Sequence, residues 1–596
     1  MSAAATSPGK PRVVTALLLW SVFALCLAGP VAAQSAAPAS AAPASAVASS
    51  VATPSPADAN AHAVPGHAAI ASAHPLATAA GEEMLAKGGN AFDAAVAVAA
   101  ALAVVEPSGN GLTGGGFFLL HRASDGLDVM VDARERAPGA ATRNMFLDPS
   151  GNPVPGLSTA TALGAGIPGE PAGLGLIARK YGRLPLKETL QPAIRLAREG
   201  FPVYPRLQAG LRFKLDVFQR QPELAREFLS NGQVPPLGFI VRQPELAKTL
   251  ELLAQHGSEA FYHGPLATRM VAGVRKLGGI WTEQDLAAYQ AIERKPIIST
   301  YRDARIVSAS PPSSGGIALV DTLHILEGYD LSAFDSATRK HLIIEAMRRA
   351  YRDRATYLGD TDFVQVPVER LLSRFYADGQ RTSIPLDKAT PSDMLGGFEN
   401  VRQGTQTTHY SILDAAGNRA AVTITLNLGF GSGLVVPATG LLLNDEMDDF
   451  SIKPGVPNAY QLVGADANSI APGKRMLSSS TPTFVETPHG LLITGSPGGS
   501  YIISMVILAT LEFMDGKSAA EIVSAPRLHQ QYLPDVVQYE PGALSADERM
   551  RLEAMGYKLR EAGRRWGNMQ AVTWDYASGK VEAASDPRGD GSGQVY

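Results

Sequence analysis

The sequence predicts an α/β sandwich of more than two layers. Residues 91–105 and 501–514 are apolar on nearly every helical face, and both stretches are too short to span a bilayer. We therefore expect two helices that are buried on all sides. Patterns typical of strands gather after residue 406. Buried helices among many strands imply layers of helices that cover sheets, an α/β (α+β) architecture.

Local signals support the helices. Asn90 is placed to cap the helix at 91–105, and Pro107 follows the end of that helix. Between the two apolar stretches, apolar residues at helical spacing predict an amphipathic helix at about 338–358. The stripe on that helix consists of Leu342, Ala346, Met347, Ala350, Tyr351 and Leu358.

The strands follow from alternation and from turn residues. Between residues 410 and 426 apolar and polar side chains alternate on both sides of a turn at 415–418, which predicts a β-hairpin. Thr407 lies at the start of this hairpin. Further strands are expected at 440–443 and 491–494.

Composition narrows the class of protein. The chain has 596 residues, 45% of them hydrophobic, a formal net charge of -4 and a pI ≈ 6.3. Length alone would suggest several domains, although large α/β architectures reach this size as one unit. Charges of both signs are interspersed, so nothing indicates a nucleic-acid or anionic-membrane partner. Small-molecule chemistry is the expectation that remains.

The N-terminus resembles an export signal. Lys10 and Arg12 precede an apolar stretch at 13–28, and small residues at 31–33 offer a cleavage site. A membrane anchor is the alternative, but about 16 apolar residues fall short of the roughly 20 needed to span a bilayer. We expect residues 1–33 to be a cleaved signal peptide and the protein to be exported, with a periplasmic location.

An Ala/Pro/Ser-rich stretch at 34–63 follows the signal and predicts a disordered linker, so that globular sequence begins at Val64. Cys26 is the chain's one cysteine and lies inside the signal. The mature protein is therefore expected to have no disulfide, thiol nucleophile or cysteine metal site.

Thr407-Thr408-His409 is the first candidate for chemistry. A threonine hydroxyl needs a base beside it, and the α-amine of the same residue can serve if threonine becomes a chain terminus. Such an amine has a pKa of about 7.7–8.0 and acts as a base near neutral pH. This chemistry demands cleavage between Gln406 and Thr407. Taken alone, two threonines at a strand start also fit ordinary β-propensity.

Two loops could serve a ligand or remain structural. The glycine-rich loop at 494–500 lies between a predicted strand and a predicted helix, and could stabilise an oxyanion, cradle a phosphate, or form a tight turn. It lacks the Gly-Lys-Ser/Thr ending of a P-loop. The acidic segment 444–450 could be a solvated loop, a cation site or a clamp for an ammonium group.

Together with two other features, these loops suggest a substrate. Ser478-Ser479-Ser480 and Arg134 are, taken singly, a polar loop and a surface charge. The carboxylate of a zwitterionic amino-acid end is held by a guanidinium and hydroxyls, and its ammonium by carboxylates and amides. This chain has candidates for each part.

At this point the sequence resembles the gamma-glutamyltranspeptidase (glutathione hydrolase) family. The resemblance runs from about Gly66 to the C-terminus, with motifs in matching order and spacing. They include GGNAFDAAVAVAAALAVVEPSGNGLTGGGFF, PPSSGG, QTTHYSILD, LLNDEMDDFS, KPGVPNAYQLVG, GKRMLSSSTPT, GSPGGS and ASDPR.

The resemblance implies a four-layer αββα sandwich of the N-terminal-nucleophile hydrolase type, and a precursor that cleaves itself before Thr407. The products would be a large subunit, residues 64–406, and a catalytic small subunit, residues 407–596, which form a heterodimer. Thr407 would be the nucleophile and Thr425 would support it. The backbone of Gly498 and Gly499 would form the oxyanion hole.

Substrate contacts are implied in the same way. Arg134, with Ser478 and Ser479, would hold the α-carboxylate of the donor. The groups that match those holding the α-ammonium are Asn427, Glu446 and Asp449, and Tyr460 matches a gating tyrosine on a lid at about 454–464. Bacterial relatives often have Gln where this chain has Glu446, a departure that should preserve ammonium binding.

The implied activity is cleavage of the γ-glutamyl amide of glutathione through a Thr407 ester. The γ-glutamyl group then passes to water or to an amino-acid or peptide acceptor. The resemblance implies no metal or organic cofactor. Two rival hypotheses remain: an acylase of the same fold for glutaryl or β-lactam side chains, and an exported binding protein without catalysis.

Overall fold

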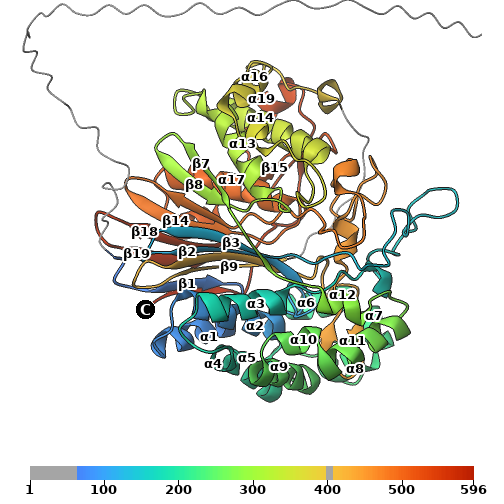
Figure 1. Ribbon diagram of the computed structural model, residues 1–596. Coiled ribbons are helices and arrows are strands. Elements are labelled where there is room, and N and C mark those ends of the chain that lie inside the picture. The colour runs from blue at the N-terminus through green and yellow to red at the C-terminus, as the bar shows by residue number, and fades with distance from the viewer. Residues whose placement is uncertain (1–63, 397–406) are drawn as a thin grey trace, which may run out of the picture. The chain divides into compact units, whose positions relative to one another are not determined.

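Two antiparallel sheets lie face to face at the centre of the protein (Figure 1). The computed structural model describes residues 64–396 and 407–596. The predicted signal peptide and linker, and Gln406, therefore lie outside the described residues. Among those described, no helix combines the length and apolar character needed to cross a membrane.

The first sheet has seven strands, and strands that follow one another in the chain do not always pair in the sheet. The predicted hairpin is present as β9 and β10, which lie in the middle of this sheet. The first strand of the described chain pairs with the last, Ala69 opposite Val595. In spatial order the strands are β20 (Ser592–Val595), β1 (Ala69–Ser72), β9 (Thr408–Leu413), β10 (Arg419–Thr425), β2 (Gly115–Arg122), β3 (Leu127–Ala133) and β6 (Ile292–Arg294).

The second sheet has six strands and packs on the first through an apolar layer that includes Phe117 and Leu119 from one side and Phe484 and Ile493 from the other. The strand expected at 491–494 is present here with one more residue at each end. In spatial order the strands are β19 (Val581–Ser585), β18 (Gln570–Asp575), β14 (Gly490–Gly495), β13 (Thr483–Glu486), β8 (Ala304–Ser308) and β7 (Ile297–Tyr301).

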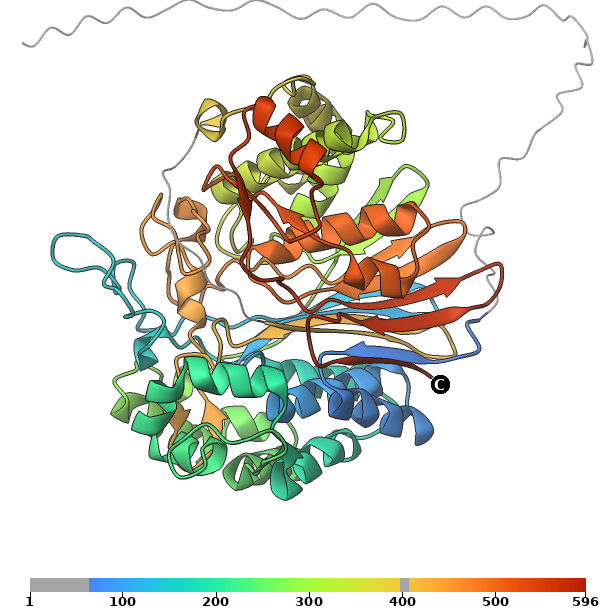
Figure 2. The same cartoon turned by 180° about the vertical axis from the view of Figure 1, so that it is seen from behind.

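Helices cover the outer face of each sheet, which gives the predicted four-layer αββα sandwich (Figures 1 and 2). Helix α2 (Ala91–Val105), capped by Asn90, is buried along its whole length under the first sheet, as predicted. The other helices of that layer are α1 (Pro75–Ala86), α3 (Glu170–Lys180), α4 (Leu186–Thr189), α5 (Gln191–Glu199), α6 (Pro205–Phe213), α7 (Leu215–Arg220), α8 (Pro222–Phe228), α9 (Pro244–His256), α10 (Glu259–Tyr262), α11 (Gly264–Lys276) and α12 (Glu283–Ala287).

The layer on the second sheet contains α17 (Tyr501–Met514), the other helix predicted from its apolar sequence. With it lie α13 (Gly315–Glu327), α14 (Ser336–Tyr357), α15 (Val368–Leu371), α16 (Arg374–Arg381), α18 (Ala519–Ser524) and α19 (Ala546–Ala554). Shorter strands form β4 (Phe201–Pro202) with β5 (Ile240–Val241), β11 (Val435–Val436) with β12 (Leu441–Leu442), and β15 (Leu528–His529) with β16 (Val537–Tyr539) and β17 (Leu559–Glu561).

Helix α14 differs from its prediction in one respect. An amphipathic helix was expected, yet its charged side is buried as well. The charges are compensated: Arg349 donates to Glu345 at 2.6 Å, and Arg348 pairs with Asp535. Burial of a charged group is tolerated when a partner of opposite charge and hydrogen bonds accompany it.

Candidate active site

The two threonines of the predicted nucleophilic pair lie side by side. Thr407 immediately precedes β9 and Thr425 ends β10, and their hydroxyl oxygens are 3.3 Å apart. On β10, Val422 and Ile424 face the helix layer, so Thr425 faces the space between the sheets. Both threonines are buried.

Asn427 follows directly and adopts a left-handed backbone conformation with φ 78°. This turn lets its backbone N–H donate to Thr425 Oγ1 at 2.8 Å, which orients the hydroxyl beside Thr407. The Asn427 side-chain nitrogen donates to the carbonyl of Asp445 at 2.9 Å. Its Oδ1 is buried and has no hydrogen-bond partner among the described residues.

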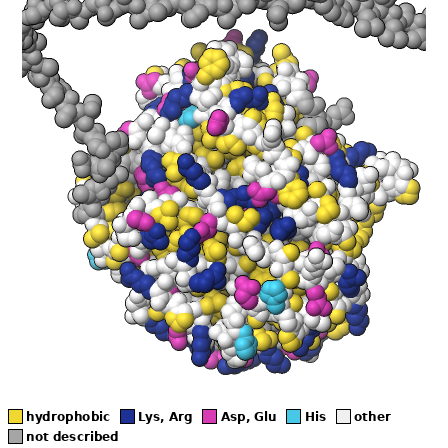
Figure 3. Space-filling view, in the orientation of Figure 1, with side chains coloured by type: hydrophobic (Ala, Val, Ile, Leu, Met, Phe, Trp, Pro, Cys, Tyr) yellow, Lys and Arg dark blue, Asp and Glu magenta, His cyan; other side chains and the backbone are white. Residues whose placement is uncertain are grey.

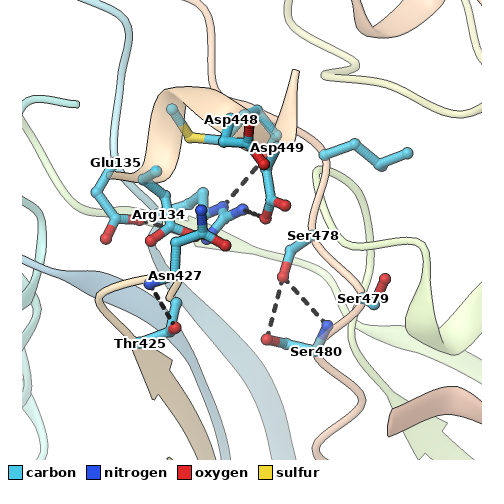
Figure 4. Close-up of polar contacts among 12 residues, drawn as sticks. Arg134, Glu135, Thr425, Asn427, Asp448, Asp449, Ser478, Ser479 and Ser480 are labelled. Atoms are coloured by element: carbon cyan, nitrogen blue, oxygen red, sulfur yellow. Dashed lines mark hydrogen bonds and ion pairs between the residues drawn. The ribbon is translucent and has the colours of Figure 1, made fainter. Parts of the chain in front are cut away.

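A buried ion cluster lies next to this turn. Arg134, at the end of β3, is fully buried and donates to Asp449 Oδ2 at 2.6 Å and to Glu446 Oε1. Figure 4 shows Arg134 and Asp449 pointing toward one another. The second oxygen of Glu446, Oε2, is buried without a hydrogen-bond partner within the described part of the chain. Two acceptors, on Asn427 and Glu446, thus lack donors.

Burial dominates the electrostatics of this cluster. Desolvation raises the pKa of Glu446 to about 8, against the opposing effect of Arg134, and also raises the pKa of Asp449. The pKa of Arg134 is raised by Glu446, Glu135 and Asp449, whose charges outweigh its own desolvation. The cluster holds more carboxyl groups than guanidinium groups, and a cation that bound there would favour their ionised form.

The serine loop lies along the same pocket. Ser478 Oγ donates to Ser480 Oγ at 3.0 Å and accepts from the Ser480 N–H at 3.1 Å (Figure 4). The hydroxyls of Ser478 and Ser479 line the pocket with Arg134. Hydroxyl groups beside a guanidinium are suited to bind a carboxylate.

Arg354 of α14 is a residue that sequence reasoning missed. Its guanidinium is buried and donates to Ser314 Oγ at 2.9 Å and to Ser479 Oγ at 3.1 Å. Within the described ranges no carboxylate lies at ion-pair distance from it, and desolvation lowers its pKa to about 10. The sequence does contain a sign of this role. Arg354 lies four residues from both Ala350 and Leu358, so a charged residue interrupts the apolar stripe of the helix.

The predicted oxyanion loop joins β14 to α17. Gly498 and Gly499 both have positive φ, 143° and 56°. A Cβ on Gly499 would lie 2.2 Å from Cδ1 of Tyr460, so glycine is required for this ring to approach the backbone. Gly499 lines the pocket with Thr407.

Tyr460 covers the pocket. Its hydroxyl donates to the Asn427 carbonyl at 2.6 Å, and the neighbouring Ala459 N–H donates to Asp448 at 2.9 Å. Asn458 donates to Asp449 Oδ1 at 3.2 Å. The remaining space in the uncut chain is about 20 Å³, room for about one water molecule.

The structure brings nearly all the sequence-predicted site residues into this one pocket. Gly498 is adjacent in the chain but is not part of the lining, and Gln406 lies outside the described residues. Two of the alternative interpretations are wrong. Arg134 is buried and is not a surface charge, and the acidic segment 444–450 is buried and is not a solvated loop. The lining includes Arg134, Thr407, Thr425, Asn427, Glu446, Asp449, Tyr460, Ser478, Ser479 and Gly499.

A larger hollow of about 630 Å³ lies elsewhere, at the other end of β14, with Gly490, Lys517 and Trp574 in its lining. It contains none of the predicted site residues. Positive and negative side chains are interspersed over the face shown in Figure 3.

The four layers, with a threonine at the start of a central strand inside a polar pocket, define an N-terminal-nucleophile hydrolase. A family model described as Gamma-glutamyltranspeptidase matches residues 77–596. The chain is 44% identical over 527 residues to the glutathione hydrolase proenzyme of Escherichia coli (strain K12), covering 87% of this chain and 90% of that protein. The chain belongs to the gamma-glutamyltranspeptidase family.

Solved structures agree with this assignment. The cephalosporin acylase from Bacillus halodurans has a TM-score of 0.77 and 29% identity, covering 92% of this chain and 98% of that one. The gamma-glutamyltranspeptidase of Helicobacter pylori has a TM-score of 0.52 and 41% identity, covering 54% of this chain and 92% of that one.

Gly499→Ala tests the fit between the glycine loop and Tyr460. A methyl group 2.2 Å from the tyrosine ring must displace either the loop or the ring, so we expect kcat/KM to fall by about 100-fold. The measurement is steady-state turnover of a chromogenic γ-glutamyl anilide.

The matched control is Gly516→Ala, another glycine with positive φ, where a Cβ would meet nothing within 4 Å. It carries a similar backbone strain of about 1–2 kcal/mol without the contact. Equal losses of activity in both variants would contradict the assigned role of the Gly499 contact.

Proposed function

We propose that this protein is a gamma-glutamyltransferase and glutathione hydrolase that matures by cutting itself before Thr407. It cleaves the γ-glutamyl amide bond of glutathione and related compounds, then transfers the γ-glutamyl group to water or to an amino-acid or peptide acceptor. The observation that carries the proposal is the pair of buried acceptors without donors, on Asn427 and Glu446, beside the Arg134 cluster and Thr407.

This arrangement suits a zwitterion. A substrate carboxylate would take hydrogen bonds from Arg134, Ser478 and Ser479, while its ammonium would supply the donors that Asn427 and Glu446 lack. Asp449, released from Arg134, would become a second counter-ion for the ammonium. A glutaryl group has no ammonium and would leave these acceptors unsatisfied in a buried site, which costs free energy.

Maturation comes first. The Thr407 hydroxyl attacks the Gln406 carbonyl, the peptide C–N bond breaks, and the Gln406 acyl group passes to the Thr407 oxygen as its nitrogen gains a proton. Water then hydrolyses the ester, which leaves the carboxylate of Gln406 and a free α-amine on Thr407. In the uncut chain that nitrogen is an amide, so the catalytic base exists only after cleavage.

Turnover uses the same hydroxyl. Thr407 Oγ1 attacks the γ-carbonyl while the α-amine accepts its proton, and backbone N–H groups of Gly498 and Gly499 stabilise the oxyanion. The amine leaving group takes the proton and departs from a γ-glutamyl ester. Thr425, 3.3 Å from Thr407 Oγ1, orients the nucleophile. Water or an amino group then resolves the ester.

The two products would remain associated after cleavage, because they share both sheets. β1 and β2, from before residue 406, flank the β9–β10 hairpin from after it. In the second sheet, β8 from the large subunit pairs with β13 from the small one. We propose a heterodimer held by these ladders, exported to the periplasm by the signal at 1–33.

Thr407→Ala should abolish both cleavage and turnover, because the variant lacks the attacking oxygen. Intact-mass measurement should find one chain, whereas the native protein gives two fragments, one beginning Thr-Thr-His-Tyr. Thr408→Ala is the matched control, since the Thr408 hydroxyl contacts Glu106 rather than Thr425. It should still be cut. A native protein that stays whole, or a cut Thr407→Ala variant, would refute the proposal and favour a non-catalytic binding protein.

Asp449→Ala separates a γ-glutamyl enzyme from an acylase of the same fold. Loss of a buried counter-ion costs about 2–5 kcal/mol, so kcat/KM for a γ-glutamyl anilide should fall by about 30-fold or more. The same variant should change turnover of the matching glutaryl anilide little. An unaltered γ-glutamyl rate would support the acylase hypothesis instead.

The pH dependence of KM reports on Glu446. Below its pKa of about 8 the carboxyl holds a proton, which must leave before the group can bind an ammonium as a carboxylate. KM for the γ-glutamyl anilide should therefore fall as pH rises through this range, roughly tenfold between pH 7 and 8.5. In Glu446→Gln, which cannot titrate, KM should be nearly constant. The same slope in both proteins would contradict this assignment.

A further inference from the structure

Directly behind the proposed nucleophile, the layer between the two sheets changes from apolar to polar. Thr407, His409 and Ser411 share one face of the strand that begins the small subunit, since side chains alternate along a strand. Most of the layer between the sheets is apolar, including Leu413 further along the same face. His409 is the first residue after Thr407 on this face of the strand.

The imidazole of His409 is fully buried and held by its own sheet. Nδ1 lies 2.8 Å from Thr423 Oγ1 on β10, and Nε2 lies 3.2 Å from Ser411 Oγ. Burial lowers the pKa of His409 to about 3, so the ring is neutral at working pH. A neutral ring that is fixed by two hydroxyls has little freedom to change its orientation.

Across the layer, the Cε1 edge of this ring meets bare backbone. A Cβ on Gly495, the last residue of β14, would lie 2.3 Å from Cε1 and 2.5 Å from Nδ1 of His409. No side chain fits between the two strands at this level. At this level an imidazole packed against a glycine separates the two sheets.

A second bridge lies beside the first. The Gln570 carbonyl on β18 accepts hydrogen bonds from Ser411 Oγ on β9 at 3.2 Å and from Thr494 Oγ1 on β14 at 3.1 Å. At the end of the sandwich that carries the pocket, the Gln570 carbonyl therefore joins the two sheets and the His409 ring packs between them. Both contacts restrict movement of β9 relative to β14.

We propose that His409 and Gly495 form a spacer that sets the distance between Thr407 and the oxyanion loop. His409 takes part in no chemical step, so it is a positioning residue. Thr407 lies two residues before His409 on one sheet, and Gly498 and Gly499 lie three and four residues after Gly495 on the other. This inference rests on the proposed roles of Thr407 and the glycine loop.

The test introduces a clash and then removes it. Gly495→Ala forces the strands apart, and displacement by about 1 Å is expected to lower kcat and the rate of self-cleavage by about 100-fold. KM should change less than about threefold, because the ion cluster around Arg134 does not contact this spacer. His409→Asn keeps a polar atom near Thr423 but lacks the Cε1 edge.

Combining His409→Asn with Gly495→Ala should restore part of the kcat that Gly495→Ala removes. The double variant is expected to recover at least tenfold in kcat over Gly495→Ala alone, whereas independent effects would simply multiply. The pH profile of kcat should be the same in His409→Asn as in the native protein, because the ring does not titrate. A shifted profile would instead make His409 a participant in proton transfer and overturn its role as a spacer.

Gly490→Ala is the matched control at the other end of β14, about 16 Å away along the strand. Its Cβ would lie 2.7 Å from the Trp574 carbonyl, so it disturbs the same strand remotely. It should lower thermal stability and leave kcat close to native. A kcat loss equal to that of Gly495→Ala, a native rate in Gly495→Ala, or no recovery in the double variant would overturn the spacer.

The native protein, assayed in parallel, separates the two proposals. If the native chain neither cuts itself nor turns over the γ-glutamyl anilide, the proposed function fails. If the native chain is active and the double variant does not recover, the function stands and the spacer fails.

Discussion

The buried ion cluster of Arg134 with Glu446 and Asp449 fixes the position of the acidic segment relative to the end of β3. A guanidinium removed from water is tolerated only when acceptors surround it, and here they come from a short helical turn some 300 residues away in sequence. That requirement ties the end of β3 to the acidic segment. Asn427 Oδ1 and Glu446 Oε2 are buried without a hydrogen-bond donor among the described residues, so a bound ligand would be suited to donate to them. Structure and recognition therefore depend on the same charges.

The cover over the pocket is tied to this cluster. Asn458 contacts Asp449, and Ala459 contacts Asp448, so the residues beside Tyr460 are held by the carboxyl groups next to which a substrate ammonium would bind. A ligand that bound Asp449 would therefore compete with Asn458. In the uncut chain the pocket beside Thr407 has room for about one water molecule.

The sandwich supplies the frame for chemistry that involves both sheets. The proposed nucleophile adjoins a strand of the first sheet and the proposed oxyanion loop follows a strand of the second, so the distance between them depends on how the sheets pack. An apolar layer holds most of this interface, while His409, Gly495 and Gln570 define it near the pocket. Strands from before and after residue 406 are hydrogen-bonded to one another in the first sheet, so a chain cut there would keep this sheet together.

Sequence alone determined the buried helices α2 and α17, the β9–β10 hairpin and the class of fold, because local periodicity and capping residues encode them. Motif resemblance located the candidate site residues. Tertiary structure alone decided that Arg134 and the acidic segment are buried, that Arg354 reaches Ser479, and that His409 meets Gly495. Such contacts join residues far apart in the chain, and their energy depends on burial and distance, which no local pattern contains.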